Sequence, residues 1–361
     1  MTRAHLEELR AANALPHTLR YDELVPYHVP FDELTSSSSV EAELGHWLAR
    51  RGRVALIGAS GSGKSSALAW ALDRHAPENL AALRIPIALA DDDTVQTPEG
   101  FARHVIRRVI AAARLEENET AELRARAADT IRRRSNERRR SRRFGLHAGV
   151  VSGELARELS QSGGEFDEQI RGGEVVEGLQ RLIELFRARD TEPLLVLEDT
   201  DTWIARPHDQ LPAQLAEAFF ARNVRMLASE LNCGFIMAVH TTYLDLPAYR
   251  EVASRLERIR IPELPHPETD LARIVGRRLD VAGLGFTLEE VFDSAALAVL
   301  AGIYEDLPDI RRAISTAAGA IRLALEEPQL DRVTAAAVRA AAAERAEDGS
   351  HSREQGERPA R

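Results

Sequence analysis

The stretch Gly58-Ala59-Ser60-Gly61-Ser62-Gly63-Lys64-Ser65-Ser66 decides the fold of this chain. It fits the pattern G-x-x-x-x-G-K-[ST], with the apolar run Val54–Ile57 before it and the helix-forming segment Ser65–Leu72 after it. Because glycine lacks a Cβ atom, its backbone can take positive φ and turn N–H groups toward an anion. The pattern therefore predicts a phosphate-binding loop at a helix N-terminus.

Lysine usage supports this interpretation. The chain has 47 lysine and arginine residues, and Lys64 is the one lysine among them. An ammonium is a compact point charge that fits a phosphate cradle, whereas a guanidinium is a planar fork. We therefore expect a nucleotide to be bound by Gly58, Ser60, Gly61, Ser62, Gly63, Lys64, Ser65 and Ser66. The hydroxyl of Ser65 is in the position of a Mg²⁺ ligand.

Composition limits the class of protein. With 361 residues, 44% hydrophobic and 5% aromatic, the chain suggests two or three helix-rich domains with a sizeable core. The net charge of −10 argues against a wholly basic nucleic-acid wrapper. No apolar signal segment is visible, and the longest apolar run, near Ala295–Ile303, is too short to span a bilayer. With Cys233 as the single cysteine, a cytoplasmic protein without membrane contact is expected.

Strand and helix patterns predict the domain organisation. Strands are expected at Val54–Ile57, Ala82–Ala90, Pro193–Leu197, Cys233–Val239 and Arg258–Ile261. Alternating with helices, they predict an α/β fold of the P-loop NTPase kind, a doubly wound parallel sheet of about five strands. A small all-α lid domain follows. The expected boundaries are 1–39 for an N-terminal helix and linker, 40–265 for the α/β domain, 266–345 for the lid and 346–361 for a disordered tail.

Helix termini carry their own signals. Thr97-Pro98 predicts a helix start with threonine as the N-cap, and Thr287–Glu290 fits a capping box. Gly283 is typical of the residue just after a helix end.

A basic insertion is expected at about 115–173. Between Arg124 and Arg143 there are ten arginines against Asp129 and Glu137, an excess of eight positive charges. Such a segment can neutralise DNA phosphates, and a solvated helix or a docking surface for an acidic protein partner explains it equally well. The candidate DNA contacts are Arg132, Arg133, Arg134, Arg138, Arg139 and Arg140.

Two acids, Glu198 and Asp199, directly follow the apolar run Pro193–Leu197. A continuous apolar run predicts a strand buried on both faces, in the centre of a parallel sheet. Acids at the end of such a strand, near a phosphate loop, can hold a hydrated Mg²⁺ and polarise an attacking water. The predicted metal ligands are Ser65, Glu198 and Asp199. A loop start with helix-capping acids is the other explanation.

With these segments the chain resembles the AAA+ superfamily, particularly its initiator branch of origin-recognition type ATPases, and the related STAND regulatory ATPases. Gly58–Ser65 matches the Walker A motif, and Leu194–Asp201 looks like a Walker B segment. Over about Val40–Glu344, apart from the insertion, the resemblance implies ATP and Mg²⁺ as cofactors and self-association in the ATP state. It further implies Thr241 as sensor 1, Arg255 as an arginine finger and Arg311, within PDIRRA, as sensor 2.

The chain also departs from the family pattern. Glu198-Asp199 stands where the family usually has Asp then Glu, so the presumed base is shorter by one methylene. A base displaced by about 1 Å can cost on the order of a hundredfold in rate, so slow or partner-stimulated hydrolysis is expected. A shifted register, with Asp199 on the metal and Asp201 free, stays open. The family usually has a winged-helix DNA reader after the lid, and we expect none after Glu344.

Two functions remain in competition. The first is a nucleotide-gated ATPase that acts as a switch or assembly factor for a DNA or protein partner, with Glu198, Asp199, Thr241, Arg255 and Arg311 as catalytic residues. The second is a regulatory module that holds ATP structurally with little or no hydrolysis. A GTPase is disfavoured because the chain has no N-K-x-D motif. Leu159–Glu165 is only faintly similar to an ABC transporter signature.

Overall fold

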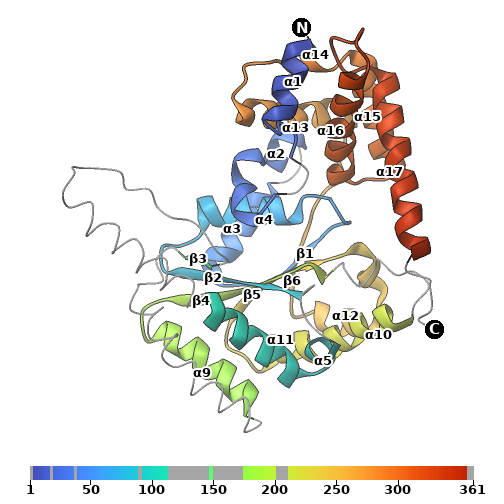
Figure 1. Cartoon of the computed structure of the whole chain (residues 1–361). Coiled ribbons are helices and arrows are strands. Elements are labelled where there is room, and N and C mark those ends of the chain that lie inside the picture. The colour runs from blue at the N-terminus through green and yellow to red at the C-terminus, as the bar shows by residue number, and fades with distance from the viewer. Residues whose placement is uncertain are drawn as a thin grey trace, which may run out of the picture. The chain divides into compact units, whose positions relative to one another are not determined.

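The computed structural model describes residues 3–16, 19–35, 39–87, 92–112, 146–148, 174–200 and 210–355. The chain divides into two compact units (Figure 1). One unit, residues 41–58 and 71–260, contains the sheet. The other, residues 1–40, 59–70 and 261–361, is helical and includes most of the glycine-rich loop. None of the described helices is both long enough and apolar enough to cross a membrane.

The sheet has six strands in the order β3-β2-β4-β5-β1-β6. Five of them are parallel: β1 (Arg53–Ile57), β2 (Leu80–Pro86), β4 (Glu192–Glu198), β5 (Gly234–Val239) and β6 (Glu257–Arg260). Every residue of β5 is buried, as is every residue of β4 after Glu192, which explains their continuous apolar sequences. The parallel α/β fold is confirmed.

One strand was not expected. β3 (Leu146–Ala148) pairs antiparallel with β2 and lies within the segment predicted to be an insertion. Three residues are too few to show a periodicity, so the sequence pattern carries no signal for this strand.

The sheet unit also contains helices, some of which bury large aromatic residues in its core. They are α3 (Val40–Arg50), α5 (Asp92–Gln96), a helix over residues 98–112, α9 (Val175–Arg187), α10 (Gln210–Ala218), the π-helical η5 (Phe219–Val224), α11 (Arg225–Ser229), the 3₁₀-helical η6 (Thr241–Asp245) and α12 (Pro247–Ala253). Figure 1 shows α9, α10, α11 and α12 on one side of the sheet. The predicted cap is confirmed, since Thr97 Oγ1 accepts from Gly100 N at 3.0 Å.

The single cysteine lies in this core. Cys233 is 4% exposed, and burial raises the pKa of its thiol to about 12. It is therefore a neutral, apolar packing residue at physiological pH, not a nucleophile.

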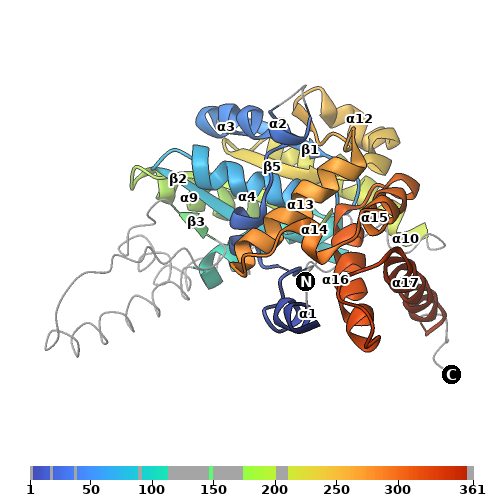
Figure 2. The ribbon, with the colours of Figure 1, turned by 90° about the horizontal axis from the view of Figure 1, so that it is seen from above.

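The helical unit is built mainly from the C-terminal helices. These are α13 (Pro267–Ala282), α14 (Leu288–Val291), α15 (Ser294–Asp306), α16 (Ile310–Glu326) and α17 (Ala335–Gln355), and α15, α16 and α17 pack against one another (Figures 1 and 2). The predicted helix stop has left-handed backbone, with φ 70° at Gly283. The capping box is present as well, because Thr287 N donates to Glu290 Oε2 at 2.7 Å.

The N-terminal segment is an integral part of this helical unit. It comprises α1 (Arg3–Ala11), η1 (Tyr21–Glu23), η2 (Val25–Tyr27) and α2 (Phe31–Leu34). Leu6 and Leu9 of α1 are buried in the same core as the residues of α13 and α16. Three arginines of α13 donate to its backbone carbonyls: Arg273 to Glu33, Arg277 to Pro26 and Arg278 to Pro16. The expected division at residue 39 therefore differs from the packing, which joins residues 1–40 to the helical unit.

The expected disordered tail also differs from the structure. The helix α17 continues to Gln355, well past residue 346. Alanine, glutamate and arginine, which favour helix, make up much of Ala335–Glu347 and carry the helix forward. Residues 356–361 lie outside the described part of the chain.

Candidate nucleotide-binding site

The glycine-rich loop has the backbone that the motif predicts at two of its three glycines. Gly61 has φ 68° and Gly63 has φ 99°. Gly58 does not take positive φ; its N–H instead donates to Val239 O at 3.0 Å and so extends the pairing of β1 with β5. The helix α4 (Lys64–His75) begins directly after the loop. The first N–H groups of α4 are therefore the donors from which a phosphate would accept hydrogen bonds.

Lys64 closes the loop on itself. Its Nζ donates to Ala59 O at 2.7 Å, and Ser62 N donates to the same carbonyl at 3.3 Å. Ser62 Oγ is buried and has no hydrogen-bond partner among the described residues. The ammonium is thus held within the loop, where a polyphosphate would compete with the Ala59 carbonyl for it.

The N-terminal segment supplies loop contacts that the sequence did not reveal. His28 Nδ1 lies 2.9 Å from Ser66 Oγ, and its ring packs near Phe31 and Trp70 at centroid distances of 6.1 and 5.9 Å. A Cβ atom on Gly63 would lie 3.5 Å from the Phe31 ring. Ser66, predicted to bind nucleotide, therefore has its hydroxyl engaged by His28. His28 lies 38 positions before Ser66 and 42 before Trp70, and no motif links them.

The helix α16 reaches the same loop from the other end of the chain. Ile310 N donates to Gly61 O at 3.1 Å, and Asp309 Oδ1 caps α16 by accepting from Arg312 N at 2.9 Å. A Cβ atom on Gly61 would lie only 1.8 Å from Asp309 Oδ1. Arg311, the sensor 2 candidate, is exposed in the first turn of α16. The contact brings the PDIRRA segment and the Walker A turn together within one unit.

The two acids after β4 lie in different environments. Glu198 is 2% exposed, and its Oε2 accepts from Arg84 Nε at 2.7 Å and lies 2.5 Å from Arg84 Nη2. Arg84 is on the neighbouring strand β2, so the ion pair joins two adjacent strands of the sheet. Asp199 is exposed and has left-handed backbone, with φ 59°. Of the two acids, Asp199 is the exposed one at the carboxyl edge of the sheet.

The residues after Asp199 are tied to β5. Thr200 Oγ1 donates to Ala238 O at 2.5 Å, and Tyr243 Oη donates to Thr200 O at 2.8 Å. The sensor 1 candidate Thr241 is the exposed first residue of η6, which is capped by His240, whose side chain accepts from Thr242 N at 3.2 Å. The loops after β4 and β5 are therefore joined at the carboxyl edge.

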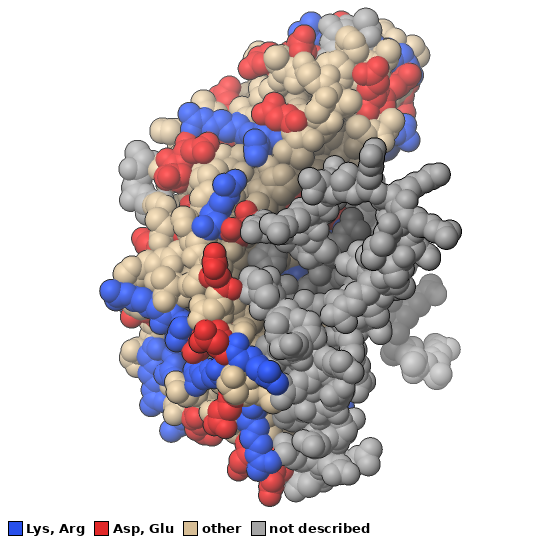
Figure 3. Space-filling view, turned by 90° about the vertical axis from the view of Figure 1, so that its left-hand side faces the viewer, with Lys and Arg blue, Asp and Glu red and all other residues tan. Residues whose placement is uncertain are grey.

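The remaining predicted site residues lie where the structure says little about their proposed roles. Arg255 is exposed after α12 and donates to Ser229 Oγ within its own chain, so its action on a second subunit stays a prediction. Asp201 and the arginines at 132–134 and 138–140 lie outside the described residues. On the face drawn in Figure 3, basic and acidic side chains of the described residues are interspersed.

The chemistry of the donors suits ATP and Mg²⁺ only in part. Among the described residues, no group of three His, Cys, Asp or Glu side chains could hold a metal on its own. The hydroxyl of Ser65 and the carboxylate of Asp199 are oxygen donors, which Mg²⁺ prefers, and phosphate oxygens complete such sites. Glu198 fits a direct metal role poorly, because its ion pair with Arg84 is buried.

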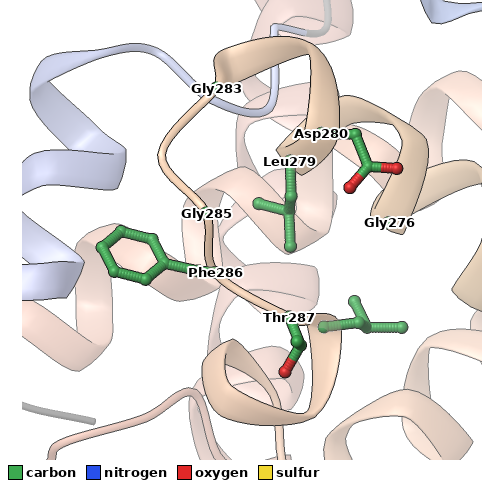
Figure 4. A pocket seen from close by; sticks show the side chains of 8 residues that line it. Gly276, Leu279, Asp280, Gly283, Gly285, Phe286 and Thr287 are labelled. Carbon is green, nitrogen blue, oxygen red and sulfur yellow. The ribbon is translucent and has the colours of Figure 1, made fainter.

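A separate pocket of about 520 Å³ lies in the helical unit between the end of α13 and the start of α14 (Figure 4). Glycines and apolar side chains form most of its wall, and Asp280 is the one carboxylate that lines it. No residue of the glycine-rich loop lines this pocket, so it is not the predicted nucleotide site.

No protein-family model matches the sequence, and no curated protein does. Similar solved structures include two of the ORC2 protein of Aeropyrum pernix, one in ADPNP–ADP complexes and one in the ADP form. The first is 16% identical and covers 88% of this chain and 69% of that chain, with a TM-score of 0.48. The second is 17% identical and covers 84% and 67%, again with a TM-score of 0.48. At this identity and TM-score, the case for nucleotide binding rests on the loop of this chain itself.

Proposed function

We propose that the protein is an ATP-binding, Mg²⁺-dependent ATPase that acts as a nucleotide-gated switch or assembly factor. The observation that carries the proposal is the contact of α16 with the Walker A turn, through Ile310 N and Gly61 O. A loop that binds a triphosphate and contacts α16 at the same turn can pass the state of the nucleotide to that helix.

The proposal assigns a separate role to each of these residues. Lys64 and the N–H groups at the start of α4 bind the phosphates, and Arg311 senses them from α16. Ser65 and Asp199 are the oxygen donors proposed for Mg²⁺, which supplies charge neutralisation at the phosphates when bound. Asp199 is also the acid proposed to orient a water, with Thr241 and Arg255 as further candidates. Glu198 has a structural role, because its ion pair with Arg84 links β4 to β2.

Turnover by the wild-type protein and by Asp199→Asn tests the proposal. A general base contributes on the order of 10²–10⁴-fold, and displacement by about 1 Å removes on the order of a hundredfold of that. We therefore expect wild-type hydrolysis to be slow and Asp199→Asn to reduce it by about tenfold more, with ATP affinity changed little. Phosphate release and calorimetric ATP binding measure the two effects. Equal turnover in both proteins would exclude Asp199.

The ion pair of Glu198 with Arg84 favours a second candidate, a module that holds ATP and does not hydrolyse it. One of the two Walker B acids is occupied by an arginine, which leaves a single acid for both the metal and the water. Tight ATP binding without phosphate release in Mg²⁺, at any partner concentration, would select this candidate.

Arg84→Met is expected to destabilise the sheet unit. It leaves the Glu198 carboxylate buried without its guanidinium, and because Arg84 is 23% exposed we expect a loss of about 1–2 kcal/mol in the free energy of unfolding. Urea unfolding of the full chain measures it. The double variant Arg84→Met/Glu198→Met replaces the pair by apolar groups and is expected to recover most of the loss. A double variant as unstable as the single one would argue against the pair.

The same proposal includes two kinds of binding partner, a second copy of this chain and DNA. We infer that ATP promotes self-association and that DNA, if bound, contacts the arginines at 132–134 and 138–140. Gel filtration with an ATP analogue tests the first inference. DNA binding across a salt series, with those arginines neutralised, tests the second, because phosphate contacts give a steep salt dependence. Indifference to DNA would point to an acidic protein partner.

A further inference from the structure

Asp199 has a backbone conformation that needs support from its surroundings. Its φ of 59° lies in the left-handed region, which L-residues other than glycine enter rarely, although Asp tolerates it better than most. Residues held in this region persist where the surrounding structure fixes them, and such positions concentrate at functional sites. The question is therefore which contacts of this chain fix the turn at Asp199.

The pairing of β4 with β5 ends just before the turn. The last paired residues are Leu197 and Met237, and Asp199 then takes left-handed backbone. Beyond it, Thr200 returns to β5 and donates its hydroxyl to Ala238 O at 2.5 Å, one residue past the last pair. Thr200 is 1% exposed, so this hydrogen bond is shielded from water.

A second buried hydroxyl holds the same residue. Tyr243 Oη donates to Thr200 O at 2.8 Å, and Tyr243 is 5% exposed. The ring packs edge-on against Phe220 at a centroid distance of 5.6 Å, which fixes its position. Thr200 is thus bound through both its side chain and its carbonyl. We call these two hydrogen bonds, Thr200 to Ala238 and Tyr243 to Thr200, the Thr200 link.

We propose that Tyr243 and Thr200 are positioning residues, which hold Asp199 in its left-handed turn and thereby fix its position at the carboxyl edge of the sheet. This inference rests on the proposed ATPase function, in which Asp199 acts on the nucleotide. Because Tyr243 belongs to η6, the same segment that carries Thr241, the Thr200 link also ties the proposed acid to the sensor 1 candidate.

Single-atom variants test the Thr200 link. Tyr243→Phe removes one hydroxyl, Thr200→Val removes the other with little change of shape, and Thr200→Ser keeps it. Displacing a catalytic group by about 1 Å can lower the rate on the order of a hundredfold. The loss of rate cannot exceed the loss caused by removing the Asp199 carboxylate itself. We therefore expect kcat to fall about fivefold to tenfold in Tyr243→Phe and Thr200→Val. The KM for ATP should stay within about twofold, and Thr200→Ser should retain wild-type turnover.

Tyr249→Phe is the matched control. Tyr249 is 2% exposed and packs on the same Phe220 ring at 5.3 Å, but its hydroxyl has no hydrogen-bond partner among the described residues. Removing that hydroxyl therefore shows the effect of losing a buried oxygen while the Thr200 link stays intact. We expect Tyr249→Phe to leave kcat unchanged.

Amide hydrogen exchange gives a readout that does not require turnover. Tyr243→Phe and Thr200→Val should accelerate exchange in the peptide covering residues 197–201, whereas Tyr249→Phe should not. Exchange and kcat that match the wild type in both link variants would overturn the positioning role and leave the ATPase proposal standing. A wild type that binds ATP without turnover would instead overturn the ATPase proposal, and exchange would then still decide whether the link fixes the turn.

Discussion

Lys64→Ala is expected to weaken ATP binding by about a hundredfold and to abolish measurable hydrolysis. Hydrogen bonds to charged groups contribute about 1.5–3 kcal/mol, and 2.7 kcal/mol corresponds to about a hundredfold. The ammonium lies within the loop, 2.7 Å from Ala59 O, and a bound polyphosphate would compete with that carbonyl as its acceptor. Calorimetric titration with ATP and Mg²⁺ measures the affinity. Lys64→Arg keeps the charge but replaces a point donor by a planar fork, and we expect it to bind almost as poorly.

The lysine content of the chain allows a sharper test of the same residue. Lys64 is the only lysine, so an amine-directed reagent can modify this side chain and otherwise only an α-amino group. ATP should slow modification of Lys64 in proportion to its occupancy, and GTP should protect less at equal concentration if the site selects adenine. Mass spectrometry of the peptide containing Lys64 follows the reaction. Modification at the same rate with and without saturating nucleotide would contradict phosphate binding at this loop.

The sequence predicted those parts of the fold that are encoded locally. The strand before the glycine-rich loop, the helix after it, the buried strand before Glu198 and the caps at Thr97, Gly283 and Thr287 are each signalled within a few residues. The parallel sheet follows from their alternation. The short strand β3 was missed because its partner β2 is more than 60 residues away in sequence and three residues show no pattern.

The parts of the site that sequence reasoning missed depend on contacts between distant segments. Arg84 reaches Glu198 across 114 positions, and only the register of β2 with β4 places them together. His28 and Asp309 reach the glycine-rich loop from opposite ends of the chain. With 46 arginines available, composition cannot indicate which one neutralises a buried acid. Tertiary packing therefore distinguishes Glu198 from Asp199, whereas the sequence predicted the same roles, metal ligand and catalytic residue, for both acids.

Gly61→Ala is expected to destabilise the helical unit by about 2–3 kcal/mol and to weaken ATP binding. Left-handed backbone costs an L-residue about 1–2 kcal/mol, and Gly61 has φ 68°. The new methyl would also lie 1.8 Å from Asp309 Oδ1, so that carboxylate must turn away from Arg312 N. Loss of an N-cap costs about 1 kcal/mol. Denaturant unfolding of the full chain measures the sum, and ATP titration measures the effect on the loop.

Gly283→Ala separates the two contributions. Gly283 has a nearly equal φ of 70°, but a Cβ atom there would meet nothing within 4 Å, so this variant carries the backbone cost alone. Asp309→Ala carries the loss of the cap alone. If the clash operates, Gly61→Ala/Asp309→Ala should be no less stable than Gly61→Ala, because the carboxylate that the methyl displaces is already gone. Strict additivity of the two single changes would mean that Asp309 does not contact the loop, and the proposed connection between the nucleotide and α16 would then rest on the hydrogen bond from Ile310 N to Gly61 O.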